Sequence, residues 1–178
     1  MKKKIKQNRL TIGLVFLLFF LGNSVWAQKV IIPKEKASPL RMISFLSSDN
    51  TYLKVTYGSP FKKGREIFGN LVPFGEIWRT GANEATEFTT TQDLKIGGEI
   101  LKAGTYTVFT VPGEKNWEVI FNSTLGQWGA YRYEDNKSFN VLKAEAKVAQ
   151  SKEFIYEAFT IQFEETRKGV DLVFAWDQ

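Results

Sequence analysis

The sequence predicts an all-β protein: an antiparallel β-sandwich or flattened barrel of about nine strands, with one long ordered loop. Three observations predict this class. Short runs of alternating apolar and polar residues recur along the chain, and turns rich in glycine, proline, asparagine or aspartate separate them. No stretch after residue 27 keeps the period of a long amphipathic helix.

Period-2 alternation places the individual strands. In the second of them, Leu53, Val55 and Tyr57 share one face. Gly97 and Gly98 suit the positive φ angles of a type I′ turn, which predicts a tight hairpin around them. The predicted strands are 41–47, 52–57, 86–92, the two arms of the hairpin 94–101, 104–111, 117–122, 141–149, 154–163 and a last one opened by Gly169.

Two of these strands carry more specific expectations. Residues 104–111 are apolar or β-branched on both faces, which favours a central strand covered on both sides. Trp117 and Trp176 occupy apolar positions in clean alternation, so both are predicted to lie in the core.

The stretch from Arg65 to Thr86 keeps no strand period, although a short helical turn is expected at Ile67–Val72. Loops of such length are usually functional or disordered. Its aromatic and apolar side chains, among them Phe68, Phe74 and Trp78, argue against disorder. This loop is therefore the predicted location of a site.

The N-terminus predicts export. A basic start, an apolar run at Leu10–Leu21 and small residues before Ala27 are typical of a secretory signal peptide, 1–27, cleaved after Ala27. Residues 28–39 are expected to be a linker or a poorly ordered mature N-terminus, and 40–178 a single β-sandwich domain. We expect a periplasmic or extracellular protein with no stable membrane anchor after cleavage.

Charge and composition exclude several function classes. The chain has 24 Lys+Arg against 19 Asp+Glu, but five of the basic residues lie in 1–27, so the rest balances at 24 − 5 = 19 against 19. No nucleic-acid partner is therefore expected. Without Cys or His, the chain has no disulfide, no Ser–His or Cys–His nucleophile and no His-ligated metal site. Any metal would have to be a hard, oxygen-liganded ion such as calcium, and the candidate segment Glu134–Asn136 lacks the ligand spacing of an EF-hand. We therefore expect neither a cofactor nor a metal.

Several segments resemble one known family. The string GREIFGNLVPFGEIWRTGANEAT at 64–86 is followed by LKIGGEILKAGTYTVFTVPG, WEVIFN and QWGAYRYE. From about Ser38 to the C-terminus the chain is similar to the bacterial domain of unknown function 2911 family, and the string at 78–86 is the most specific part. The resemblance implies a compact β domain, exported from Bacteroidetes-type bacteria. It implies no established activity and no site residues.

The candidate ligand-binding residues are Arg65, Trp78, Arg79, Asn83 and Glu84. Arginine binds carboxylates and phosphates bidentately, Asn83 offers a donor and an acceptor, and Trp78 could stack on a ligand. They favour an exported binding module for a small anionic or carbohydrate-like envelope ligand. The alternative for the same residues is structural: a buried Arg–Glu pair, or Arg79 bonding the carbonyls of an irregular loop.

Two other functions stay open. One is a hydrolase that acts on glycans with carboxylates alone, using Glu84 with Glu76 or Glu87. The other is a structural or interaction protein of the cell envelope. Trp128, Tyr131 and Tyr133 could form an exposed sugar platform, but we favour a buried plug at one end of the sandwich.

Overall fold

The computed structural model describes residues 34, 36–151 and 153–178. These residues belong almost entirely to one compact unit, Glu35–Gln178. The predicted signal peptide 1–27 lies outside the described residues, as does most of the predicted linker 28–39. In the described part of the chain, no helix has the length and hydropathy that a membrane span requires.

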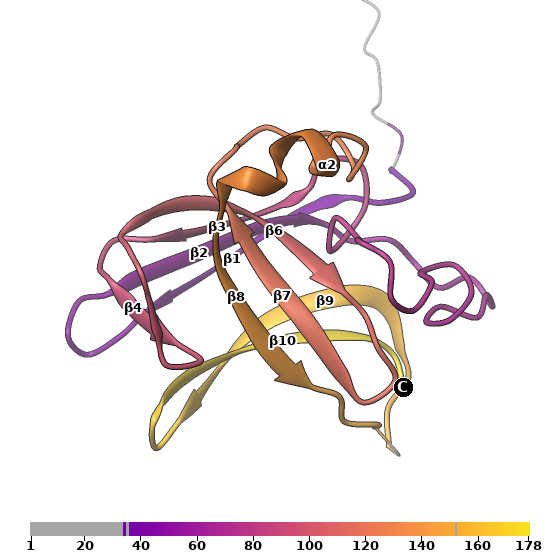
Figure 1. The fold of residues 1–178 in the computed structure, drawn as a ribbon. Coiled ribbons are helices and arrows are strands. Elements are labelled where there is room, and N and C mark those ends of the chain that lie inside the picture. The colour runs from indigo at the N-terminus through magenta and orange to yellow at the C-terminus, as the bar shows by residue number, and fades with distance from the viewer. Residues whose placement is uncertain (1–33, 35, 152) are drawn as a thin grey trace, which may run out of the picture. The chain divides into compact units, whose positions relative to one another are not determined.

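In the described residues, ten strands and two very short helices confirm the all-β prediction (Figure 1). Each predicted strand is present, with ends shifted by a few residues. In chain order the elements are β1 (Leu40–Leu46), β2 (Tyr52–Gly58), β3 (Thr86–Thr90), β4 (Leu94–Ile96), β5 (Glu99–Leu101), β6 (Gly104–Val111), β7 (Asn116–Asn122), α2 (Tyr133–Asn136), η1 (Lys137–Phe139), β8 (Asn140–Lys147), β9 (Tyr156–Thr166) and β10 (Gly169–Asp177).

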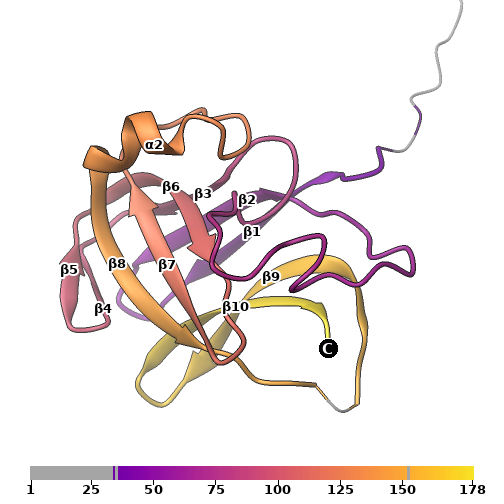
Figure 2. The ribbon, with the colours of Figure 1, turned by 45° about the vertical axis from the view of Figure 1, so that its right-hand side comes forward.

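The strands form one large sheet and two hairpins. The large sheet has the order β1-β2-β3-β6-β7-β8, and all its neighbouring strands are antiparallel. The β9–β10 hairpin lies across one face of that sheet in both views, and the β4–β5 hairpin lies at one end (Figures 1 and 2). Gly97 and Gly98, with φ of 60° and 98°, make the turn between β4 and β5, as the sequence predicts.

The main core lies between the large sheet and β9–β10. The alternating residues Leu53, Val55 and Tyr57 are buried there, and the Tyr57 ring meets Phe159 edge-on at 5.7 Å between centroids. Both tryptophans predicted to be core residues are buried in this layer: Trp117 from β7 and Trp176 from β10. Local alternation therefore identified the face that packs.

A smaller core covers the opposite face of the central strands. Phe109 of β6 and Ile120 of β7 are fully buried there against Tyr133 of α2. The rings of Phe109 and Tyr133 are 5.0 Å apart. This confirms that strand 104–111 is covered on both faces.

The helical turn predicted at Ile67–Val72 is wrong. Phe68 and Val72 form a β-bridge instead, and the Gly69 amide donates to the Val72 carbonyl at 2.9 Å. Gly69 has φ of 88°, which no right-handed helix accommodates. The short helix lies at Tyr133–Asn136, where four residues are too few to show a helical period.

The sandwich is closed along one side and open along the other. On the closed side, the Phe159 amide donates to the Pro60 carbonyl at 2.8 Å, and the rings of Phe45 and Phe163 meet at 5.9 Å. On the other side, β8 and β10 are edge strands of separate sheets, and among the described residues no backbone hydrogen bond joins them. The two sheets therefore diverge toward β8 and β10.

Candidate functional site

The loop between β2 and β3 is ordered because it continues the sheet. Beyond the end of β3, Trp78 takes the place of a strand residue beside β6: its amide donates to Thr110 at 2.8 Å, and Thr110 donates back at 2.9 Å. The Gly75 amide donates to the Pro112 carbonyl at 2.8 Å. These bonds satisfy backbone groups that an irregular buried segment would otherwise leave unpaired.

The same loop runs directly against β2. A Cβ added to Gly58 would lie 2.0 Å from the Ala82 carbonyl oxygen, so only glycine fits at this crossing. Thr80 and Asn83 both adopt left-handed φ angles, 56° and 64°, which cost energy for residues other than glycine. The buried Thr86 hydroxyl helps to hold this conformation by donating to the Thr80 carbonyl at 2.6 Å.

Trp78 belongs mainly to the core. Its exposed fraction is 7%, its ring stacks on Trp176 with centroids 6.1 Å apart, and it meets Phe159 at 5.0 Å. Its Nε1 donates to the Gly81 carbonyl at 3.2 Å. The ring therefore organises the loop, and only a small part of it is accessible.

The two candidate arginines have different environments. Arg65 is exposed, and its guanidinium donates to the carbonyls of Lys62 and Phe61 at 2.9 and 2.5 Å. Arg79 is half-buried, and its Nε has no hydrogen-bond partner among the described residues. Burial lowers the pKa of Arg79, an effect that the nearby Tyr131 opposes. The guanidinium stays charged at neutral pH nonetheless.

The described residues contain no ion pair between Glu84 and either Arg65 or Arg79. Glu84 is exposed and forms an isolated β-bridge with Trp128. A buried Arg–Glu pair is therefore not what holds this loop. Bonds to loop carbonyls do occur, but from Arg65 rather than from Arg79.

Asn83 connects three segments of the chain. Its Nδ2 donates to the Ser38 carbonyl at 3.4 Å, and its own carbonyl accepts from the Gly129 amide at 2.9 Å. Nearby, Glu87 accepts from the Gly126 amide at 3.1 Å. Glu87, one of the carboxylates considered for hydrolysis, thus helps to fix the loop between β7 and β8.

Four of the five candidate residues line one hollow of about 470 Å³. Arg65, Trp78, Arg79 and Asn83 contribute to it, and Glu84 does not. We call it the basic hollow, because its charged lining residues are Lys63, Arg65 and Arg79, with no acidic residue. Sequence reasoning missed Lys63 and Trp176; Lys63 lies two positions before the predicted loop, whereas Trp176 comes from the distant strand β10.

Two residues of this lining have a buried side-chain donor without a partner. Among the described residues, Arg79 Nε and Trp176 Nε1 are the buried side-chain polar atoms that have no hydrogen-bond partner. Both residues line the basic hollow. Buried N–H groups are nearly always paired, because leaving one unpaired costs about 1–3 kcal/mol. Two residues of this lining therefore carry a donor that the described residues leave unpaired.

The aromatic residues after β7 divide between surface and core. Trp128 is 61% exposed and Tyr131 is 84% exposed, whereas Tyr133 is buried. The favoured prediction of a buried plug is therefore wrong for Trp128 and Tyr131 and right for Tyr133. Of these three rings, Tyr133 is the one that packs on Phe109, within the smaller core.

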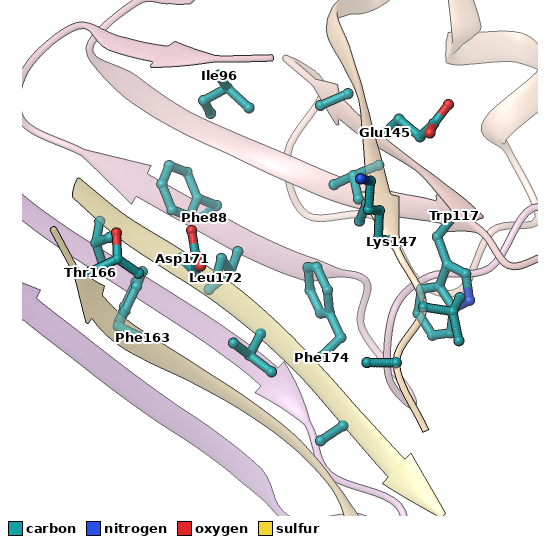
Figure 3. Close-up of a pocket in the computed structure, with 18 of the residues that line it drawn as sticks. Phe88, Ile96, Trp117, Glu145, Lys147, Phe163, Thr166, Asp171, Leu172 and Phe174 are labelled. Carbon is teal, nitrogen blue, oxygen red and sulfur yellow. The ribbon is translucent and has the colours of Figure 1, made fainter. Parts of the chain in front are cut away.

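A second hollow, which sequence reasoning missed, lies between the diverging sheets. We call it the apolar cleft after its inward-facing wall residues, and charged residues also contribute to its lining. It measures about 1510 Å³, and Figure 3 shows Leu172 and Phe174 of β10 facing the large sheet across it. On β8 the inward positions Ala144 and Ala146 carry small side chains. The small residues at these inward positions of an edge strand are the feature of the sequence from which the cleft could have been predicted.

Residues 38–178 match the family model described as "Protein of unknown function (DUF2911)". The chain belongs to this family. The match confirms the predicted resemblance and its extent. No curated protein and no solved structure matches the chain.

Proposed function

We propose that this domain binds a small anionic ligand in the basic hollow. The observation that carries the proposal is a hollow whose charged lining residues are the cations Lys63, Arg65 and Arg79, with no carboxylate. Arg79 and Trp176, which both line it, each carry a buried donor without a partner among the described residues. A bound carboxylate or phosphate would be attracted by these cations, and an arginine guanidinium can bind such a group bidentately.

The hollow's chemistry favours an anion over a neutral sugar. Sugar hydroxyls donate as well as accept, so binding sites for neutral glycans need acceptors beside their donors. The charged residues of this hollow are all cations. A carbohydrate-like ligand would therefore bind through an acidic group, with the exposed ring of Trp128 outside the hollow as an additional stacking surface.

Each candidate residue has a distinct role in this proposal. Arg79 supplies the unpaired, half-buried charge. Arg65 is oriented by two loop carbonyls and adds a second positive charge. Asn83 has a long bond of 3.4 Å from Nδ2 to Ser38, which a ligand oxygen could replace. Glu84 lies outside the lining and takes no part in binding.

Calorimetric titration with small anions and acidic sugars, at fixed ionic strength, tests the proposal. We expect at least one carboxylate- or phosphate-bearing compound to bind, and Arg79→Ala to weaken it by about 10- to 100-fold. Arg41→Ala is the matched control, because Arg41 is an exposed arginine on β1 outside the hollow. Binding that survives Arg79→Ala, or that Arg41→Ala weakens equally, would refute the proposal.

We further propose that the protein acts outside the cytoplasm, as the N-terminal sequence suggests. The envelope then supplies the candidate ligands, such as acidic wall and glycan fragments. Fractionation of cells that express the full chain, with mass spectrometry of the N-terminus, tests this. We expect a periplasmic or secreted product that begins at Gln28, and a full-length cytoplasmic product would contradict it.

A further inference from the structure

The cleft between β8 and β10 is much larger than the small voids that imperfect packing leaves in a protein core. Clefts that hold drug-sized ligands measure roughly 300–1,000 Å³, whereas this one measures about 1510 Å³. Its apolar lining residues Phe163, Leu172 and Phe174 pack against the core but remain only partly buried. Two stacked rings, Trp117 and Phe174, bridge the sheets at 6.4 Å, so the walls are supported rather than collapsed.

The cleft has a defined end wall. Leu94 and Ile96 of the β4–β5 hairpin pack against the core at its edge, and Ile96 faces the space in Figure 3. At the hairpin turn, a Cβ on Gly97 would lie 3.7 Å from the Ala144 Cβ, so the hairpin touches β8 there. A space between two sheets, with one closed end and apolar inward-facing side chains, suits a chain-like molecule.

The strands on either side of the mouth are poor partners for an added strand. β8 presents Lys143, Glu145 and Lys147 on its exposed face, and charged side chains of this kind block edge-to-edge pairing. The pairing of β10 with β9 is irregular between Ala175 and Asp177, which also discourages strand addition. These features disfavour a peptide strand or a second copy as the occupant, and favour a small molecule that enters between the sheets.

Charge at the cleft restricts the head group of such a molecule. Seven Asp or Glu residues line the cleft or its rim against three lysines, Lys95, Lys147 and Lys168. Glu145 and Lys147 belong to the rim, since they lie on the exposed face of β8, and Asp177 is paired with Lys62, so five acids and two lysines remain. An anionic head group would meet a surplus of like charge there. The cleft thus has the opposite charge preference to the basic hollow.

We propose that the cleft is a second binding site, which takes an amphiphile with a single unbranched hydrocarbon chain and a neutral or cationic head group. The chain lies between the walls formed by β8 and β10, and Ala144 and Ala146 leave the room it occupies. This site is independent of anion binding in the basic hollow, and failure of one proposal leaves the other standing.

Displacement of a neutral fluorescent dye, Nile red, by twelve-carbon amphiphiles tests the inference. The probes are dodecanol, dodecylamine and dodecanoate, each used below the concentration at which it aggregates. We expect dodecanol and dodecylamine to displace the dye, and dodecanoate to be weaker by about tenfold, because like charges repel. No displacement by any of the three would overturn the inference, and equal displacement by all three would overturn the head-group preference.

Two variants locate the binding. Ala146→Phe fills the cleft, and Leu172→Asn makes one wall polar; each is expected to weaken dodecanol binding at least about tenfold. Ala103→Phe is the matched control, because Ala103 is exposed and outside the cleft. Should Ala146→Phe fail to fold, Leu172→Asn alone decides. Undiminished binding in the folded variants, or a dimer in sedimentation that both variants dissociate, would overturn the inference.

Discussion

The basic hollow and the apolar cleft share one lining residue, Trp176, and otherwise differ in every respect that matters for binding. The hollow is small, is lined by three cations and includes in its lining Arg79 and Trp176, each of which has an unpaired buried donor. The cleft is about three times larger, has apolar walls and is lined by more acids than lysines. One sandwich thus presents two chemically opposite environments on either side of a single tryptophan.

The difference follows from how each hollow is made. The basic hollow is built by a long loop whose backbone is fixed to β6 and β2, so its side chains are free to carry charge. The cleft is built by two sheets that meet along β1 and β9 and separate along β8 and β10. The side chains of the loop therefore determine the basic hollow, and the divergence of the two sheets determines the cleft.

The largest effect is expected where the two hollows meet. Trp176→Ala removes a ring that stacks on Trp78 at 6.1 Å and meets Phe159 at 5.8 Å. We expect the free energy of unfolding to fall by about 3–5 kcal/mol, measured by denaturant titration. Trp128→Ala is the control, because Trp128 is 61% exposed and should cost under about 1 kcal/mol. Equal losses of unfolding free energy in the two variants would mean that Trp176 does not belong to the core between the two hollows.

Filling a cavity should distinguish the open cleft from the closed core. Ala146→Ile places apolar atoms in the cleft and should raise the free energy of unfolding by about 1 kcal/mol. The same change at the buried Ala85, in the smaller core, should lower it by about 1–3 kcal/mol through overpacking. Denaturant unfolding of the two variants measures the contrast. Destabilisation of similar size at both positions would show that the cleft is already filled.

Arg79 should contribute to binding at a cost to stability. Arg79→Met keeps the length of the side chain but removes a half-buried charge and an unpaired donor. We expect unfolding free energy to stay unchanged or to rise by up to about 1 kcal/mol, while anion binding is lost. Chemical denaturation and calorimetry of the same variant check both. A loss of 3 kcal/mol or more, of about the size expected for a broken buried pair, would assign Arg79 to the scaffold.

The smallest effect is expected at Glu84. It is exposed, makes no ion pair among the described residues and lies outside both hollows. Glu84→Gln should change the unfolding free energy by less than about 0.5 kcal/mol and leave anion binding intact. Loss of binding or of a hydrolytic turnover in this variant would restore Glu84 as a functional residue.

Much of the fold was predictable because strand alternation is a local property. Leu53, Val55 and Tyr57, for example, show their buried face without reference to any partner strand. The helical turn at Ile67–Val72 failed because a few apolar residues fit a turn and a helix equally well. The exposure of Trp128 and Tyr131 could not be predicted, since it depends on which ring reaches Phe109, and Tyr133 does.

The candidate site was predictable in part. The loop's composition indicated Arg65, Trp78, Arg79 and Asn83, which do line one hollow. Glu84 follows these residues in the sequence but does not line the hollow. Asn83, with its left-handed φ angle, changes the direction of the chain just before Glu84. Trp176 could not be identified as a lining residue from the sequence, because its contact with the loop, through Trp78, depends on how the distant strand β10 packs. The cleft depends likewise on the divergence of two sheets.

The most direct test of the two-environment account is a nitrogen–proton NMR titration of the indole and guanidinium side chains with inorganic phosphate at constant ionic strength. We predict that the Arg79 Nε–H and Trp176 Nε1–H signals shift and saturate together, while the Nε1–H of Trp117, which lines only the cleft, stays fixed. Signals that all stay fixed, or that move with Trp117 without saturating, would contradict it.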